Sequence, residues 1–251
     1  MQTRLAGWML AAVALLGSCA TSPRPSTSNK ITVGAAANLT QVFSEIGSAF
    51  TARTGVEVVF SYGSTAQLAQ QIENGAPFDL LAAADTEHVD ALVSGNKLVA
   101  DSRAVYALGQ LAIWSPNAGV RELKDLNRKQ VRFIAIAQPE LAPYGRAAVE
   151  ALKHAGLWES LRPKLVFGSN INQAKQLAAS GNADAAFTAY SLVLHESGTV
   201  IKVDPSIYRP IEQALGIVTG SPRIEEAQRF RSFLLGPEGR AILARGGYLL
   251  P

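Results

Sequence analysis

Four short segments of neutral polar residues each follow an apolar, strand-like run and precede a helix-like run. They offer amide, hydroxyl, phenol and free backbone N–H groups, and Glu140 is their only charged residue. A fully ionised tetrahedral oxyanion has only acceptor atoms, so a shell made of donors alone suits it. The pattern therefore predicts an oxyanion site without a cationic side chain. The segments are Ala37–Thr40, Tyr62–Ala66, Pro139–Gly145 and Gly168–Ile171.

The position of each segment at the start of a helix gives a second reason to expect an oxyanion site. The first N–H groups of a helix have no partner within the helix, and the helix dipole adds positive potential there. Helix N-termini consequently bind anions. Each segment alone could be an ordinary N-cap or turn, because Asn, Ser, Thr and Gly are common at both. Their recurrence at four strand-to-helix junctions favours a binding site.

The elements that must position these segments alternate along the chain. The alternation of strands and helices predicts an α/β fold with parallel sheets flanked by helices. Two long strand-like stretches, 106–114 and 211–218, join what look like two α/β units. We therefore expect two lobes with a cleft, and a ligand beyond the carboxyl ends of the strands. The other predicted strands are 31–36, 56–61, 79–84, 131–136, 164–167, 184–189 and 200–203.

Composition excludes several classes of protein. Apolar residues make up 48% of the 251 residues, which is enough for a substantial core, and the formal charge is +3. The densest group of cations, within residues 121–132, also contains Glu122 and Asp125 and reads as a solvated face. We find no basic stripe and no nucleic-acid-binding motif, and therefore expect no nucleic-acid partner.

The amino terminus predicts export. Arg4 precedes an apolar run from Leu5 to Gly17, which is typical of a secretory signal and is too short to span a bilayer. The run 16–19, Leu-Gly-Ser-Cys, resembles a bacterial lipoprotein box, and that resemblance implies cleavage before Cys19 and lipidation of its thiol. Ordinary cleavage after Ala20 is the alternative. We divide this region into a signal peptide, 1–18, and a flexible tether rich in Pro, Ser and Thr, 19–29.

Several sequence segments resemble the periplasmic molybdate-binding proteins of ABC importers. They are 31–40 (ITVGAAANLT), 63–65 (GST), 71–80 (QIENGAPFDL), 83–85 (AAD), 138–145 (QPELAPYG) and the Gly-Pro … Gly-Gly-Tyr ending of 236–248. The resemblance covers nearly everything from Lys30 to Pro251. It implies a two-lobed periplasmic-binding-protein fold of type II, with crossover strands at 108–114 and 211–218. Lobe 1 would comprise 30–112 and 213–251, and lobe 2 would comprise 113–212.

The same resemblance implies the site residues. Asn38 matches a ligand after the first strand, and Thr65, with Ser64 beside it, matches a ligand in the second loop. Tyr144 matches a ligand before Gly in the third loop, and the backbone N–H of Ile171 matches a donor in the fourth. A further tyrosine of some members falls at Ala189 here. Two additional candidates are Asn170 and Tyr190.

The implied function is capture of molybdate or tungstate in the periplasm and delivery to an ABC permease. We expect a monomer without a cofactor, anchored to the membrane through Cys19. One alternative is another oxyanion such as sulfate. Ferric-ion receptors share this fold and use tyrosines, so Tyr144, Tyr190 and Tyr208 keep a ferric site open as well.

An enzyme is the weaker interpretation. The sequence lacks the GxSxG, HExxH and P-loop motifs. His88, His154 and His195 do not have the spacing of metal ligands, and the carboxylates Asp79 and Asp85 fit strand-end and helix-cap positions. We therefore predict a binding protein and not a hydrolase.

Overall fold

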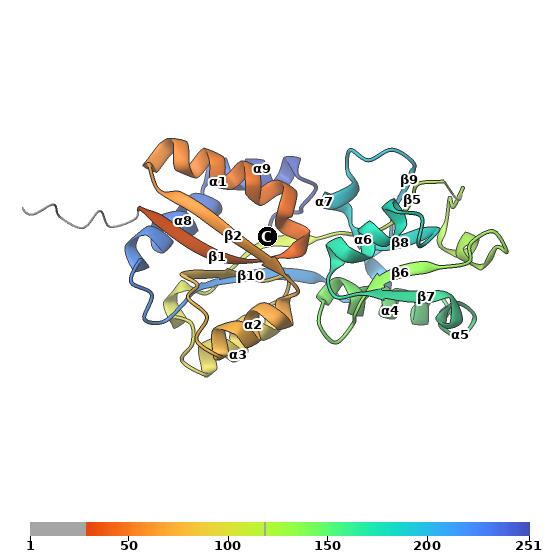
Figure 1. The fold of residues 1–251 in the computed structure, drawn as a ribbon, viewed down its shortest axis with the longest axis horizontal. Coiled ribbons are helices and arrows are strands. Elements are labelled where there is room, and N and C mark those ends of the chain that lie inside the picture. Colours follow the sequence, from red (N-terminus) through yellow and green to blue (C-terminus); the bar gives the residue numbers. More distant parts are fainter. Residues whose placement is uncertain (1–28, 118) are drawn as a thin grey trace, which may run out of the picture.

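The computed structural model describes residues 29–117 and 119–251 (Figure 1). The predicted signal peptide, Cys19 and all of the predicted tether except Asn29 lie outside the described residues. Within the part of the chain that is described, no helix is both long enough and apolar enough to cross a membrane.

The strands form two five-stranded mixed sheets, with orders β2-β1-β3-β10-β4 and β7-β6-β8-β5-β9. In each sheet three strands run parallel, β2-β1-β3 in one and β7-β6-β8 in the other, and the remaining pairings are antiparallel. The α/β fold predicted from the alternating pattern is therefore present twice. The strands are β1 (Lys30–Ala36), β2 (Glu57–Gly63), β3 (Leu80–Ala82), β4 (Ala104–Gly109), β5 (Leu111–Ser115), β6 (Ile134–Ala137), β7 (Leu165–Gly168), β8 (Ala185–Ala189), β9 (Thr199–Lys202) and β10 (Ile211–Ile217).

Helices flank both sheets, and Figure 1 shows the two sheets side by side as separate lobes. Helices α1, α2, α3, α8 and α9 surround the first sheet, and α4, α5, α6 and α7 surround the second. The helices are α1 (Thr40–Thr54), preceded by the 3-10 turn η1 (Ala37–Leu39), α2 (Thr65–Glu73), α3 (Glu87–Ser94), α4 (Pro143–His154), α5 (Trp158–Leu161), α6 (Ile171–Ala179), α7 (Tyr190–Val193), α8 (Ile224–Leu235) and α9 (Pro237–Arg245).

Helix α1 shows how the sequence sets this packing. Its apolar residues recur at helical spacing, so that Phe43, Ile46 and Phe50 are all fully buried. Phe50 meets Phe230 of α8 edge to face, with ring centroids 5.2 Å apart. The helix ends at Gly55, whose φ of 71° is the left-handed conformation that glycine adopts without strain. The apolar spacing of one helix thus fixes its attachment to the first sheet.

The chain passes between the sheets at two places. Strand β4 belongs to the first sheet and β5 to the second, with only Gln110 between them. The strand-like stretch 106–114 therefore contains two strands, because Gln110 lies where the backbone leaves one sheet for the other. The chain returns through residues 203–210 into β10. The division into lobes at residues 112 and 213 remains our proposal, while the strands change sheet at Gln110 and before Ile211.

Candidate functional site

A small cavity lies between the two lobes, where the four polar segments meet. Its volume is about 10 Å³, far less than the about 300–1,000 Å³ of a site for a drug-sized ligand. None of the described residues that line it is charged. They are Ala36, Ala37, Asn38, Gly63, Ser64, Thr65 and Ala84 from the first lobe and Ala142, Pro143, Tyr144, Asn170 and Ile171 from the second. The structure thus brings Asn38, Ser64, Thr65, Tyr144, Asn170 and Ile171 together.

Four helical segments begin at this cavity: η1, which leads into α1, and the helices α2, α4 and α6. Ser64 is the N-cap of α2 and Asn170 that of α6, while Pro143 is the first residue of α4. Free N–H groups and the positive ends of the helix dipoles therefore surround the cavity. The attraction for an anion comes from these helix ends, since the lining supplies no cation.

The hydroxyls of Ser64 and Thr65 are both arranged to donate into the cavity. The Ser64 Oγ accepts a long hydrogen bond of 3.4 Å from the Gln67 N–H, as part of a capping box. The Thr65 Oγ1 accepts one of 3.0 Å from the Ala84 N–H. Each oxygen thereby receives a backbone donor, and its own hydrogen remains for a ligand.

Tyr144 is 1% exposed, and its hydroxyl oxygen accepts a hydrogen bond of 3.1 Å from Gln213 Nε2. Its own hydrogen therefore also remains for a ligand. Burial raises the pKa of the Tyr144 hydroxyl well above its usual range. Tyr144 consequently stays a neutral donor, which suits an oxyanion better than the phenolate ligation of a ferric ion. Among the described residues there is also no cluster of three His, Cys, Asp or Glu that could hold a metal.

Asn38 is buried, and its side-chain amide is only partly paired. Its Nδ2 donates to Gln213 Oε1 at 2.9 Å and to the Tyr248 hydroxyl at 3.0 Å. Its Oδ1 has no hydrogen-bond partner among the described residues. A buried amide oxygen without a partner is unusual in a folded protein. Both hydrogens of Nδ2 are used within the protein, so the donor that this segment offers to an oxyanion is the backbone N–H at the start of η1.

The remaining candidates divide into those at the cavity and those away from it. Asn170 Oδ1 accepts a hydrogen bond of 3.0 Å from the Gln173 N–H, so this side chain caps α6. The cap leaves the N–H of Ile171, the first residue of α6, available at the cavity wall. Tyr190 does not line the cavity, and its ring packs beneath the ammonium of Lys202, 4.1 Å from the ring centroid.

Comparison with known families fits this geometry. Residues 31–249 match the family model described as bacterial extracellular solute-binding protein. The chain belongs to this family. The family is one of binding proteins, which confirms the prediction of a solute-binding protein in place of an enzyme.

Individual relatives narrow the comparison. The molybdate-binding protein ModA of Rhodobacter capsulatus is 36% identical over 227 residues, covering 90% of each chain. The solved periplasmic molybdate-binding protein of Azotobacter vinelandii superposes with a TM-score of 0.85 at 32% identity, covering 88% of this chain and 99% of that one. The sulfate-binding protein SubI of Mycobacterium tuberculosis shares the fold, with a TM-score of 0.71 at 19% identity, covering 87% of this chain and 86% of that one. The two-lobed periplasmic-binding-protein fold is confirmed.

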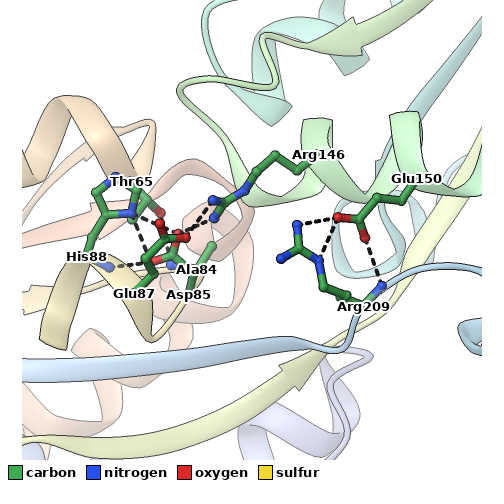
Figure 2. A network of polar contacts seen from close by, with 8 residues as sticks. All are labelled: Thr65, Ala84, Asp85, Glu87, His88, Arg146, Glu150 and Arg209. Atoms are coloured by element: carbon green, nitrogen blue, oxygen red, sulfur yellow. Dashed lines mark hydrogen bonds and ion pairs between the residues drawn. The ribbon is translucent and has the colours of Figure 1, made fainter. Parts of the chain in front are cut away.

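The two lobes of this solute-binding protein are held together beside the cavity (Figure 2). Arg146 of α4 donates to Asp85 at 2.8 Å and to Glu87 at 2.7 Å, so the second lobe is paired with the first. His88 also contacts Asp85, at 2.9 Å, and this hydrogen bond raises the His88 pKa. A backbone bond of 3.2 Å from the Ala66 N–H to the Leu141 carbonyl adds a further contact between lobes. The structure is therefore a closed form.

A second ion pair holds the segment through which the chain returns to the first lobe. Arg209 donates to Glu150 of α4 from its side chain, at 2.7 Å, and from its backbone N–H, at 2.9 Å (Figure 2). Burial alone would raise the Glu150 pKa, but these bonds outweigh burial and lower it. Glu150 therefore remains an ionised partner of this segment.

Sequence reasoning missed several polar residues around the cavity. Gln213, Tyr248 and Ser191 form a hydrogen-bonded shell behind Asn38. Gln213 had a recognisable signal, since it is a lone amide inside the apolar stretch 211–218. Ser191 and Tyr248 had none, because only the fold brings them to Asn38.

Proposed function

We propose that this protein captures molybdate or tungstate outside the cytoplasm and delivers it to an ABC importer. The observation that supports this most directly is the closed interlobe cavity, which is lined by neutral donors and by the starts of helices. Its small volume excludes a drug-sized ligand, and its lining suits a ligand made only of acceptors. The named relatives from Rhodobacter capsulatus and Azotobacter vinelandii are molybdate-binding proteins, which supports the choice of ion.

Within this proposal the ligand is held from both lobes. The backbone N–H of Asn38 at the start of η1 and the hydroxyls of Ser64 and Thr65 bind it from the first lobe, and the Tyr144 hydroxyl and the Ile171 N–H bind it from the second. Asn170 contributes by capping α6. Either hydroxyl of the pair can donate, because each oxygen already accepts from a backbone N–H.

Selectivity against sulfate follows from closure. Donors that come from two lobes have fixed separations once the lobes are held together. A larger tetrahedral ion reaches all of them at once, whereas a smaller ion leaves some donors unpaired. An unpaired buried donor costs about 1–3 kcal/mol. Sulfate is therefore the appropriate competitor, since the fold alone also serves sulfate binding elsewhere.

Calorimetry on the chain from Lys30 to Pro251 tests this function. We expect tight binding of molybdate and tungstate, and weak or undetectable binding of sulfate and phosphate. Binding should resist moderate salt, because buried interactions are screened less than surface charge pairs. Equal affinity for sulfate and molybdate would rule the proposal out.

We also propose that Cys19 is the first residue of the mature chain and carries lipid. A tether of about ten residues would then hold the binding lobes near the permease. Cys19→Ala should release the protein into the soluble periplasmic fraction or leave an uncut precursor. Wild-type protein that is already soluble, with Thr21 at its amino terminus, would show ordinary signal cleavage.

A further inference from the structure

The side chain of Gln213 joins the two halves of the cavity. It lies on β10, is 0% exposed, and is the one buried polar residue of that strand. Its Oε1 accepts from Asn38 Nδ2 at 2.9 Å, and its Nε2 donates to the Tyr144 hydroxyl at 3.1 Å. One amide therefore touches a cavity residue from each lobe. A buried amide is unfavourable unless it is hydrogen-bonded, so its contacts account for its presence in this strand.

The direction of the Gln213 amide is coupled to that of the Asn38 amide. Its Oε1 lies 2.9 Å from Asn38 Nδ2 and 3.0 Å from the Tyr106 hydroxyl, which has a single hydrogen and also lies 2.9 Å from the Ala83 carbonyl. Turning the Gln213 amide alone would place its NH₂ group against the NH₂ group of Asn38. With Asn38 Nδ2 donating to Gln213 and to Tyr248, the donor end of Gln213 lies on the side of Tyr144.

This direction decides which way the Tyr144 hydroxyl points. A tyrosine hydroxyl has one hydrogen, and its oxygen accepts here from Gln213. The hydrogen cannot point back at Gln213, so it is left for the cavity. We infer that Gln213 is a positioning residue that turns the Tyr144 O–H toward the bound oxyanion, an inference that rests on the proposed function.

The backbone next to Gln213 leaves room for this contact. The pairing of β10 with β4 shifts register between Gln213 and Ala214. Gly109, which pairs with Ile211, ends β4, and a Cβ atom there would lie 2.2 Å from the Tyr144 hydroxyl and 2.7 Å from Gln213 Nε2. A side chain at position 109 would thus collide with both ends of the hydrogen bond. The contact between Gln213 and Tyr144 therefore depends on the glycine at the end of β4.

The substitution Gln213→Glu tests the inference, because both oxygens of a carboxylate accept. The Tyr144 O–H would then donate to the new carboxylate and turn away from the ligand. We expect molybdate affinity to fall by more than about a hundredfold near pH 8, since a charged group is also introduced. Protonating the new carboxyl restores a donor toward Tyr144, so at least about tenfold should be recovered near pH 6. Wild-type affinity should change little over this range.

Charge repulsion alone would also weaken binding, so the second step combines Gln213→Glu with Tyr144→Phe. If Gln213 acts through the Tyr144 hydroxyl, the loss caused by Gln213→Glu should be at least about tenfold smaller in the Tyr144→Phe background. If the affinity loss of the double variant equals the product of the two single losses, the inference is overturned. The matched control is Gln110→Glu, which makes the same change in the other crossover segment, where the amide donates to the Gly247 carbonyl. That control should leave affinity nearly unchanged.

A third variant keeps the test decisive if a buried carboxylate prevents folding, which thermal unfolding of the ligand-free variants would reveal. Gln213→Met removes the amide and frees the Tyr144 hydroxyl to rotate, so it should weaken binding by about three- to tenfold. This loss should disappear in the Tyr144→Phe background, and its persistence there would overturn the inference.

If the wild-type protein binds sulfate and not molybdate, the proposed function fails, but the same cycle of variants measured with sulfate still tests the role of Gln213. A wild-type protein that binds no oxyanion would overturn both.

Discussion

The guanidinium of Arg146 lies 2.8 Å from the carboxylate of Asp85, across the junction of the two lobes. Arg146 follows Tyr144 by two residues in α4, and Asp85 directly follows Ala84, whose N–H donates to Thr65. The ion pair therefore lies next to proposed ligand contacts on both sides of the cavity. Closing the lobes and completing the ligand shell are one event in this geometry.

We predict that Arg146→Met speeds release of the ligand. The pairs of Arg146 with Asp85 and Glu87 join the two lobes in the closed structure, so their loss favours opening. A partly exposed charged pair contributes about 1 kcal/mol or less, which corresponds to binding weaker by up to about fivefold. Stopped-flow measurement of dissociation should show this change mainly in the off-rate. The control is Arg162→Met, which removes a cation paired with Glu159 within the second lobe, and an equal effect of both variants would contradict a role in closure.

His88 gives this junction a dependence on pH. The hydrogen bond to Asp85 raises the His88 pKa above its ordinary value of about 6.5, against the opposing effects of burial and Arg146. A raised pKa in the folded state means that protonated His88 stabilises the fold. That contribution is fully present below about pH 6.5 and is lost as the pH rises through the raised pKa. We therefore predict that His88→Gln lowers the melting temperature more near pH 6 than near pH 8.

The measurement for His88 is thermal unfolding of the wild type and the variant at both pH values. Asp85, Glu87 and Arg146 surround the ring, so they must stay unchanged in both proteins. The control is His195→Gln, which removes a histidine outside this junction. A difference between wild type and His88→Gln that is the same at both pH values would contradict the prediction.

The arrangement of the strand ends was predictable from the sequence. Apolar runs located all the parallel strands. The strands β3, β6 and β8 are buried along their whole length and read as continuous apolar segments, whereas the edge strands β2 and β7 are partly exposed. The polar loops that follow four of these strands were predicted to form one site, because the carboxyl ends of parallel strands meet at one edge of a sheet. The cavity lining from Asn38 to Ile171 follows from that pattern together with the family resemblance.

The tertiary contacts behind the lining were not predictable in this way. Helix α3 was not predicted, because its short sequence carries only two buried residues, Val89 and Leu92. The contacts of Tyr248 with Asn38 and of Arg146 with Asp85 join segments 210 and 61 residues apart. Local periodicity carries no information on such pairs. Sequence adjacency was in turn a poor guide to Tyr190. It became a candidate because it follows Ala189, the position of a family tyrosine, but its ring packs against Lys202.

Tyr144→Phe should weaken molybdate binding by roughly ten- to a hundredfold. The substitution removes only the hydroxyl, and a hydrogen bond from a neutral donor to a charged acceptor is worth about 1.5–3 kcal/mol. The ring remains packed, so the melting temperature of the ligand-free protein should change little. Calorimetry checks the affinity, and an unchanged affinity would show that Tyr144 only shapes the cavity wall.

Gly109→Ala should weaken binding by at least about tenfold through the same hydroxyl. The new Cβ would lie 2.2 Å from the Tyr144 hydroxyl and 2.9 Å from Tyr144 Cζ, so the ring must move away from the closed cavity. Loss of one charge-assisted hydrogen bond sets the lower limit of about tenfold. The control is Gly34→Ala in β1, where a Cβ would meet Leu68 and Phe78 at an ordinary 3.5 Å. Combining Gly109→Ala with Tyr144→Phe removes the nearest clashing atom, so the melting temperature of the double variant should lie above that of Gly109→Ala alone. If the double variant were less stable than either single variant, the dominant clash would be with Gln213 Nε2, 2.7 Å from the new Cβ, and not with the Tyr144 hydroxyl.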